Sequence, residues 1–115
     1  MKEHEGVRIT KAYLDKEEER VAAYVMVEIE TTDEAEMQRY REMAPPSIAA
    51  HGGRYIVRGG AVQTLEGDWA PPRLVVLEFA NADDARRWWS CEEYREAKEV
   101  RQRAGRTRMI LVEGV

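Results

Sequence analysis

The stretch Arg54-Tyr55-Ile56-Val57-Arg58-Gly59-Gly60 is the most informative part of the chain, because it combines a strand pattern, an arginine and a glycine break. Side chains in a strand alternate between the two faces of a sheet, so Tyr55 and Val57 are expected on one face. Ile56 and Arg58 then share the other face. An arginine there needs an anionic partner, water or a ligand, because burying it unpaired is very costly. Arg58 is therefore the first candidate for a functional residue.

The rest of the chain divides into strands and helices at its cap and turn residues. Runs rich in Val, Ile and Tyr predict strands, and Thr, Asp and Asn predict helix starts. Pro45 and Pro46 lack the amide donor that a helix needs, so we expect the first helix to be interrupted there. The predicted strands cover residues 21–30, 54–58, 73–79 and 107–113, and the second of them continues after a glycine bend as 61–65. The first predicted helix runs from the caps at 31–33 to Ala44, with a further turn at 48–50. A second helical segment starts at Asn81 or Asp83 and runs through Trp89, and a third covers 92–104.

The order of these elements is β-α-β-β-α-β, which is typical of the ferredoxin-like α+β class. One antiparallel sheet would carry two helices on a single face. Val25, Val27 and Ile29, with Val75, Leu77 and Phe79, are expected under the helices. The alternate set would leave large apolar groups on the uncovered face, which predicts a homodimer packed sheet against sheet.

Composition indicates one globular domain, with 115 residues, 43% hydrophobic and 35% charged. The net charge of −4 argues against nonspecific nucleic-acid binding, which needs a basic surface. Acidic residues begin the last helix and basic residues end it, which suits the helix dipole. We therefore expect a solvated helical face that includes the basic residues Arg101, Arg103, Arg106 and Arg108.

Cys91 is the only cysteine, so an internal disulfide and a cysteine-rich zinc cluster are excluded. No apolar stretch has the pattern of a signal peptide or the length of a membrane span. We expect a cytoplasmic protein without a membrane partner. Residues 1–20 carry a charge run and are expected to form an extension, with the domain over 21–115.

Several motifs in the same order resemble the bacterial family known as domain of unknown function thirteen-thirty, in the dimeric α/β-barrel superfamily. The resemblance covers roughly Ala23 to the C-terminus. It is carried by Arg58-Gly59-Gly60, Leu65-Glu66-Gly67-Asp68-Trp69, Val75-Val76-Leu77-Glu78-Phe79, Trp88-Trp89, Glu93-Tyr94 and Leu111-Val112-Glu113-Gly114. Where the family pattern has serine before a proline-glutamate-tyrosine turn, this chain has Cys91 and Glu92.

The resemblance implies a ferredoxin-like protomer whose sheet closes with a partner's sheet into a barrel. It implies no activity, because the family has none established. Other branches of the superfamily include cofactor-independent monooxygenases, haem-degrading enzymes, muconolactone isomerases and chlorite dismutases, which for this chain is analogy from fold.

Arg58 and Glu78 are expected on neighbouring strands and on the same face. One interpretation is a buried ion pair that fixes the register of the sheet or dimer. The other is that Arg58 binds a substrate carboxylate or enolate while Glu78 exchanges a proton, since a carboxylate in an apolar cleft has a raised pKa. Glu28 is expected near the other end of the central strands, with Arg108 as its partner.

Further candidates surround this pair. His51 ends the first helix and can act as a base near neutral pH, or can simply bond the last helical carbonyls. Tyr24 and Trp69 would form walls of the pocket, with Trp69 as a lid or a loop anchor. The two histidines are far apart in sequence and Cys91 has no evident base, so no metal site, cofactor or nucleophile is predicted.

Two functions remain open from the sequence. The first is a protein that binds or transforms a small organic molecule, anions included, in the barrel cleft without a cofactor. The catalytic candidates are Glu78 and His51, and the ligand-binding candidates are Arg58, Tyr24, Glu28 and Trp69. The second is a noncatalytic dimeric domain in which Arg58 and Glu78 form a structural ion pair.

Overall fold

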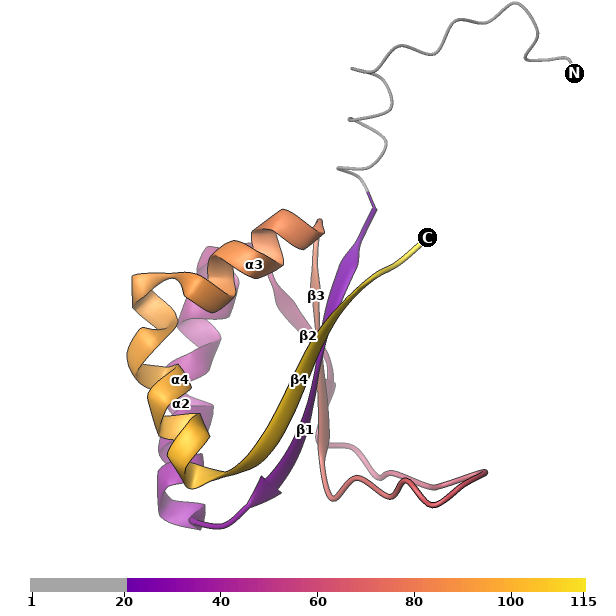
Figure 1. Cartoon of the computed structure of the whole chain (residues 1–115). Coiled ribbons are helices and arrows are strands. Elements are labelled where there is room, and N and C mark those ends of the chain that lie inside the picture. Colours follow the sequence, from indigo (N-terminus) through magenta and orange to yellow (C-terminus); the bar gives the residue numbers. More distant parts are fainter. Residues whose placement is uncertain (1–20) are drawn as a thin grey trace, which may run out of the picture.

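A computed structural model describes residues 21–115, and the predicted extension over residues 1–20 lies outside the described part. This described part contains four strands and three helices (Figure 1). They are β1 (Ala23–Thr31), α2 (Glu34–Ala50), β2 (Arg54–Arg58), β3 (Leu74–Phe79), α3 (Ala82–Ser90), α4 (Glu92–Ala104) and β4 (Gly105–Glu113).

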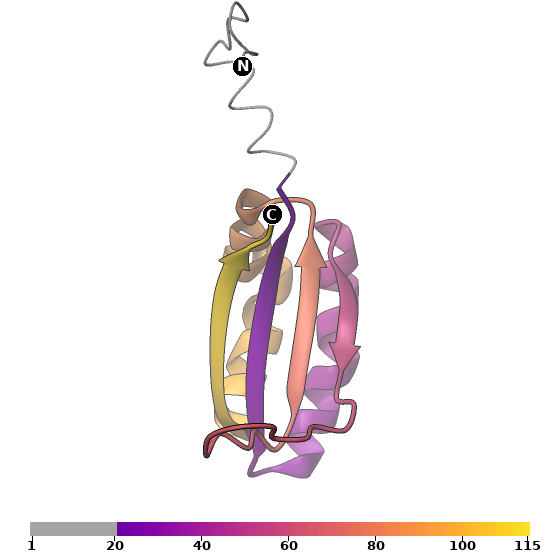
Figure 2. The ribbon, with the colours of Figure 1, turned by 90° about the vertical axis from the view of Figure 1, so that its right-hand side faces the viewer.

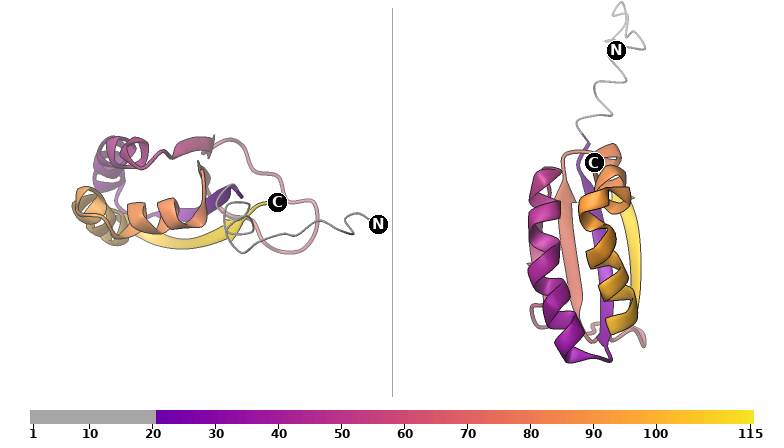
Figure 3. Two further views of the ribbon diagram at one scale, coloured as in Figure 1. Left: turned by 90° about the horizontal axis from the view of Figure 1, so that it is seen from above. Right: turned by 90° about the vertical axis from the view of Figure 1, so that its left-hand side faces the viewer.

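The strands form one antiparallel sheet in the order β2-β3-β1-β4. All three helices cover the same face of this sheet, and α2 and α4 lie side by side across it (Figures 1 and 3). No helix of residues 21–115 covers the opposite face, and Figure 2 looks directly onto it. The predicted ferredoxin-like α+β fold is confirmed.

The core lies between the sheet and the helices. The alternate residues of β1 and β3 that were expected under the helices are all buried. Trp88 fills the space above them, with its ring centroid 5.6 Å from that of Phe79 and 4.2 Å from that of Tyr94. The indole N–H donates to the hydroxyl of Ser47 on α2 at 3.1 Å, so its polar group is satisfied inside the core.

Two predicted boundaries are wrong. Helix α2 continues through Pro45 and Pro46 without interruption. Only the carbonyls one turn earlier lose their donors, and Pro46 itself is exposed, so the helix tolerates the break in its hydrogen-bond ladder. The expected strand over 61–65 is absent from the described part, where residues 59–73 form a loop that projects beyond the uncovered face (Figure 1).

A bulge in β2 decides where its arginines point. Arg54 pairs with Glu78 and Tyr55 with Leu77, but the register then shifts so that Val57 pairs with Val76. The extra residue, Ile56, reverses the alternation that the sequence predicts.

As a consequence, Arg58 pairs with Val75, whose side chain is buried under the helices. The expectation that Arg58 shares the uncovered face with Glu78 is therefore wrong.

No helix in the described part is long and apolar enough to cross a membrane.

Candidate functional site

The structure separates the predicted site residues into three places. Four of them, Tyr24, Glu28, Trp69 and Glu78, belong to the uncovered face or to the loop beside it. Arg58 lines a cavity on the helix side of the sheet. His51 lies at the end of α2, near two residues of the α3–α4 junction.

On the uncovered face, Glu78 is paired with a different arginine from the one predicted. Arg54 Nε donates to Glu78 Oε1 at 2.7 Å, and the Tyr24 hydroxyl donates to Oε2 at 3.4 Å. Glu78 is three-quarters buried, with a side-chain exposure of 25%, whereas Arg54 is 72% exposed. The bulge explains the exchange, because it brings Arg54 opposite Glu78 and turns Arg58 away.

The predicted Glu28–Arg108 pair is confirmed, with Arg108 Nε donating to Glu28 Oε1 at 2.8 Å. The Trp69 indole N–H donates to the other carboxylate oxygen at 3.3 Å, so the loop between β2 and β3 bends back to β1. These three residues line a groove of about 320 Å³ together with Met26, Leu74 and Ile110.

Arg58 lies at a small cavity between α2 and the sheet. Its guanidinium carbon is 4.1 Å from the centroid of the Tyr55 ring, which is cation–π distance. The cavity has a volume of about 30 Å³, and its polar lining comes from Tyr40, Arg41, Tyr55, Arg58 and Arg73. Its remaining lining is apolar: Val27, Ile29, Met37, Ile48, Val75 and Leu77.

Gly59 allows the second arginine to approach this cavity. A Cβ at that position would overlap the Arg73 guanidinium in its present position, and the backbone has φ +76°. The left-handed conformation favours glycine, and the absence of a side chain lets Arg73 lie across this position. The Gly59 N–H still donates to Leu74 O at 3.0 Å, so the edge of the sheet stays ordered while Arg73 lies across it.

A buried polar chain runs from α4 to this cavity. Arg101 Nε donates to the Tyr94 hydroxyl at 3.3 Å, and the Tyr94 and Tyr40 hydroxyls are 2.8 Å apart. Arg101 also donates to the Thr107 hydroxyl. Arg101 is only 4% exposed, so its placement on a solvated helical face is wrong.

Burial raises the pKa of Tyr40 well above its ordinary value, and the neighbouring Tyr94 raises that pKa further. Burial also raises the pKa of Tyr55, against the opposing effect of the Arg58 and Arg73 charges. Both phenols therefore remain protonated at neutral pH and present hydroxyl groups rather than phenolates.

A larger groove of about 560 Å³ lies between α3 and β4. Arg101 forms part of its lining, and Trp88, Trp89, Met109 and Leu111 supply aromatic and apolar surface. The Arg101–Tyr94–Tyr40 chain thus connects the lining of this groove to that of the small cavity through the core.

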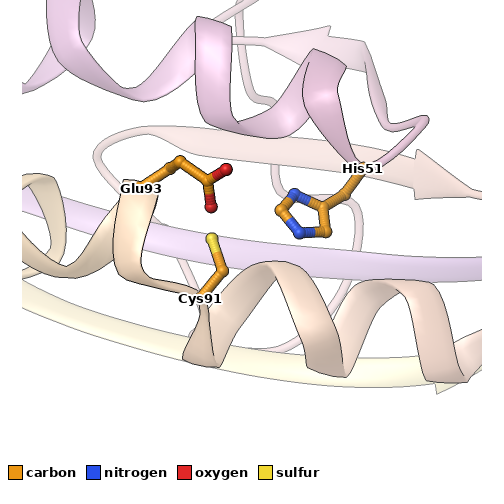
Figure 4. A group of neighbouring side chains, drawn as sticks. All are labelled: His51, Cys91 and Glu93. Atoms are coloured by element: carbon orange, nitrogen blue, oxygen red, sulfur yellow. The ribbon is translucent and has the colours of Figure 1, made fainter.

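His51 lies beside Cys91 and Glu93 (Figure 4). One ligand-type atom of each side chain lies within 4.8 Å of the other two. Burial raises the pKa of the Cys91 thiol, and its hydrogen bond to the Glu93 carboxylate raises it further. The pKa of Glu93 is lowered by its own backbone N–H, by that thiol and by the charge of His51.

Comparison with known families assigns the chain. The family model described as "Domain of unknown function (DUF1330)" matches residues 22–115. The protein belongs to the DUF1330 family. None of the curated proteins matches it.

Solved structures share the fold of this DUF1330 chain at low identity. A protein of unknown function from Rhodopseudomonas palustris is 16% identical with TM-score 0.68, covering 95% of this chain and 96% of its own. A conserved protein from Methanosarcina mazei is 15% identical with TM-score 0.55, covering 87% and 99%. A putative antibiotic biosynthesis monooxygenase from Nitrosomonas europaea is 17% identical with TM-score 0.53, covering 84% and 91%.

Sequence reasoning missed three polar residues of the DUF1330 core: Tyr40, Arg73 and Arg101. For Arg101 the sequence did indicate burial, because this residue lies on the same helical stripe as Tyr94, Ala97 and Ala104, which are all buried. For Arg73 there was no local signal, since its position depends on the bulge and on the Gly59 turn. The contact of Cys91 and Glu93 with His51 was also missed, because it joins two helices that are far apart in sequence.

Proposed function

We propose that this DUF1330 protein binds a small organic anion in the cavity between α2 and the sheet, without a cofactor. One observation carries the proposal: every polar side chain that lines the cavity is a tyrosine or an arginine, and none is a carboxylate. A cavity with hydrogen-bond donors, positive charge and apolar walls is complementary to a carboxylate or enolate that carries a short apolar group.

Within residues 21–115, no carboxylate neutralises the two arginines at the end of the cavity. Arg41 bonds Glu34, but neither Arg58 nor Arg73 forms an ion pair with any acidic residue in that range. Two guanidinium groups without a carboxylate partner in the described part, both near the phenol ring of Tyr55, favour an anion between them.

Tyr40 can supply a proton to such an anion. The Tyr94 and Tyr40 hydroxyls are 2.8 Å apart and either can donate to the other, while Tyr94 also accepts a hydrogen bond from Arg101. When Tyr94 donates to Tyr40, the Tyr40 hydroxyl proton is left for the cavity, and the buried Arg101 charge polarises the chain. Protonation of a bound enolate by Tyr40 is the chemistry that these residues can support.

The cavity limits the size of the ligand. Its volume of about 30 Å³ compares with the ~10–15 Å³ that one water requires and the ~150 Å³ of a cavity that takes benzene. We therefore expect the cavity to take the carboxylate of a two- or three-carbon acid, held at Arg58 and Arg73, with the alkyl group outside it. Benzoate should bind much more weakly.

The test is isothermal titration of the purified protein with acetate, propionate and benzoate. The affinity for acetate or propionate should fall at least tenfold in Arg58→Gln and in Arg73→Gln, and should not change in Arg106→Gln. Arg106 is the matched control because it is an exposed arginine that pairs with Glu30 on β1. Equal affinity in wild type and the Arg58→Gln/Arg73→Gln double variant would disprove the proposal.

We further propose that the uncovered face binds a second copy of the chain. On this face Val57, Ile110 and Val112 are 40%, 59% and 44% exposed. The projecting loop exposes Leu65 at 87% on the same side of the sheet (Figure 1). A symmetric dimer would bury the face of each sheet and give each loop a surface to pack on.

Assembly can be measured directly by sedimentation velocity of the full chain at micromolar concentration. The expected result is a dimer mass, and a monomer across that range would rule out this assembly.

The purely structural interpretation of the sequence required an ion pair between Arg58 and Glu78. That pair is not formed, since Glu78 bonds Arg54. The anion site therefore rests on different residues from those of the dimer face.

A further inference from the structure

Three segments converge at the end of α2. His51 is the C-cap of α2, Cys91 joins α3 to α4, and Glu93 lies in the first turn of α4 (Figure 4). The imidazole, the thiol and the carboxylate point toward one another, with one ligand-type atom of each within 4.8 Å of the others. None of the three takes part in the anion site between α2 and the sheet.

The hydrogen bond of His51 determines which ring nitrogen is available. Nδ1 lies 3.0 Å from the backbone carbonyl oxygen of Ser47, which can only accept. Nδ1 must therefore carry the proton, and Nε2 presents its lone pair. A histidine that donates one ring N–H to a backbone carbonyl is oriented as metal-ligating histidines usually are.

We propose that His51 Nε2, Cys91 Sγ and a Glu93 carboxylate oxygen form a site for a borderline-soft divalent metal ion, with Zn²⁺ as the natural occupant. One imidazole, one thiolate and one carboxylate are ligands that Zn²⁺ accepts. Mg²⁺ and Ca²⁺ prefer oxygen ligands throughout, and this set offers one such side chain. Three protein ligands leave the fourth tetrahedral position for water or a ligand atom.

The geometry requires only a small adjustment. Tetrahedral Zn²⁺ with bonds of about 2.0–2.3 Å places its ligand atoms about 3.5 Å apart, so the three groups would close by roughly 1 Å. Glu93 is exposed, and His51 and Cys91 are partly exposed, so the side chains can move and an ion can enter from solvent.

The experiment is titration of the full chain with Co²⁺, followed by competition with Zn²⁺. Cys91 is the only cysteine, so a sulfur-to-cobalt charge-transfer band can arise from no other residue. We expect this band at one Co²⁺ per chain and its loss when Zn²⁺ is added. Absence of the band at saturating Co²⁺ would overturn the proposal.

Variants assign the other two ligands. His51→Ala and Glu93→Gln should each weaken Zn²⁺ binding at least tenfold in competition with a chromophoric chelator, and Cys91→Ser should abolish the cobalt band. Glu92→Gln is the matched control for Glu93, and His4→Ala is the control for the second histidine. Undiminished affinity in His51→Ala, with folding verified by circular dichroism, would overturn the site, as would equal losses in the two controls.

Discussion

At the scale of single residues, the Tyr40 hydroxyl links the stability of the core to pH. Because burial raises its pKa, the folded state retains the proton at pH values where an unfolded tyrosine loses it. Above about pH 10 the unfolded state binds fewer protons than the folded state, so the free energy of unfolding falls as pH rises. This contribution is fully present below about pH 10.

Replacing Tyr40 with Phe should therefore flatten the alkaline side of the stability profile. At neutral pH the variant should be less stable by about 1 kcal/mol, because Tyr94 loses a hydrogen-bond partner. Urea denaturation at about pH 8 and about pH 11 measures both effects, and the gap between variant and wild type should narrow at the higher pH. A gap that stays constant would mean that Tyr40 does not resist ionisation.

Individual residues also show how much of the candidate site could be predicted from the sequence alone. Arg58 was identified because an arginine in an apolar strand is conspicuous, and Arg108 as the partner of Glu28 followed from the strand order. Glu78 was given the wrong arginine because a one-residue bulge has no reliable signal in one sequence. His51 was chosen for its chemistry, but its neighbours depend on how α2 packs against α4.

At the scale of elements, strand patterns were the most reliable part of the prediction. Strands β1 and β3 are flanked on both sides and bury one face, so their period-two pattern was unambiguous. In the edge strand β2 only Tyr55 is half-buried and the other residues are exposed, so hydrophobic pattern constrained this strand weakly. Helix α2 was predicted to break because local propensity was weighed without the packing that sustains the helix.

The prolines of α2 should lower its stability without determining its position. Pro45 and Pro46 remove two backbone hydrogen bonds from the helix interior. The Pro45→Ala/Pro46→Ala variant should gain about 1–2 kcal/mol in free energy of unfolding, after subtraction of the greater entropy of its unfolded chain. Chemical denaturation measures this, and a loss of stability would show that the proline rings contribute packing that outweighs the missing bonds.

At the scale of the whole molecule, the contrast between the two sheet faces governs assembly. Ile110 lies on the uncovered face opposite Met26 and is 59% exposed. Ile110→Glu should convert the proposed dimer to a monomer, since each copy would bury an unpaired carboxylate in the interface. Sedimentation velocity reads out the change.

Trp89→Glu is the matched control, because Trp89 is 46% exposed but lies on α3, away from the uncovered face. This variant should sediment as the wild type does. A dimer that survives Ile110→Glu but dissociates on Trp89→Glu would place the interface on the helical side instead.

The bulge at Ile56 has a consequence for how such chains can diverge. Deleting Ile56 would remove the bulge and leave strict alternation, with Arg54 still opposite Glu78 and Arg58 still opposite Val75. A single codon lost at this point would therefore keep each positive charge on its present side of the sheet. Related chains that lack this residue should be aligned with the gap at Ile56, because a gap placed elsewhere in the strand would match residues from opposite sides.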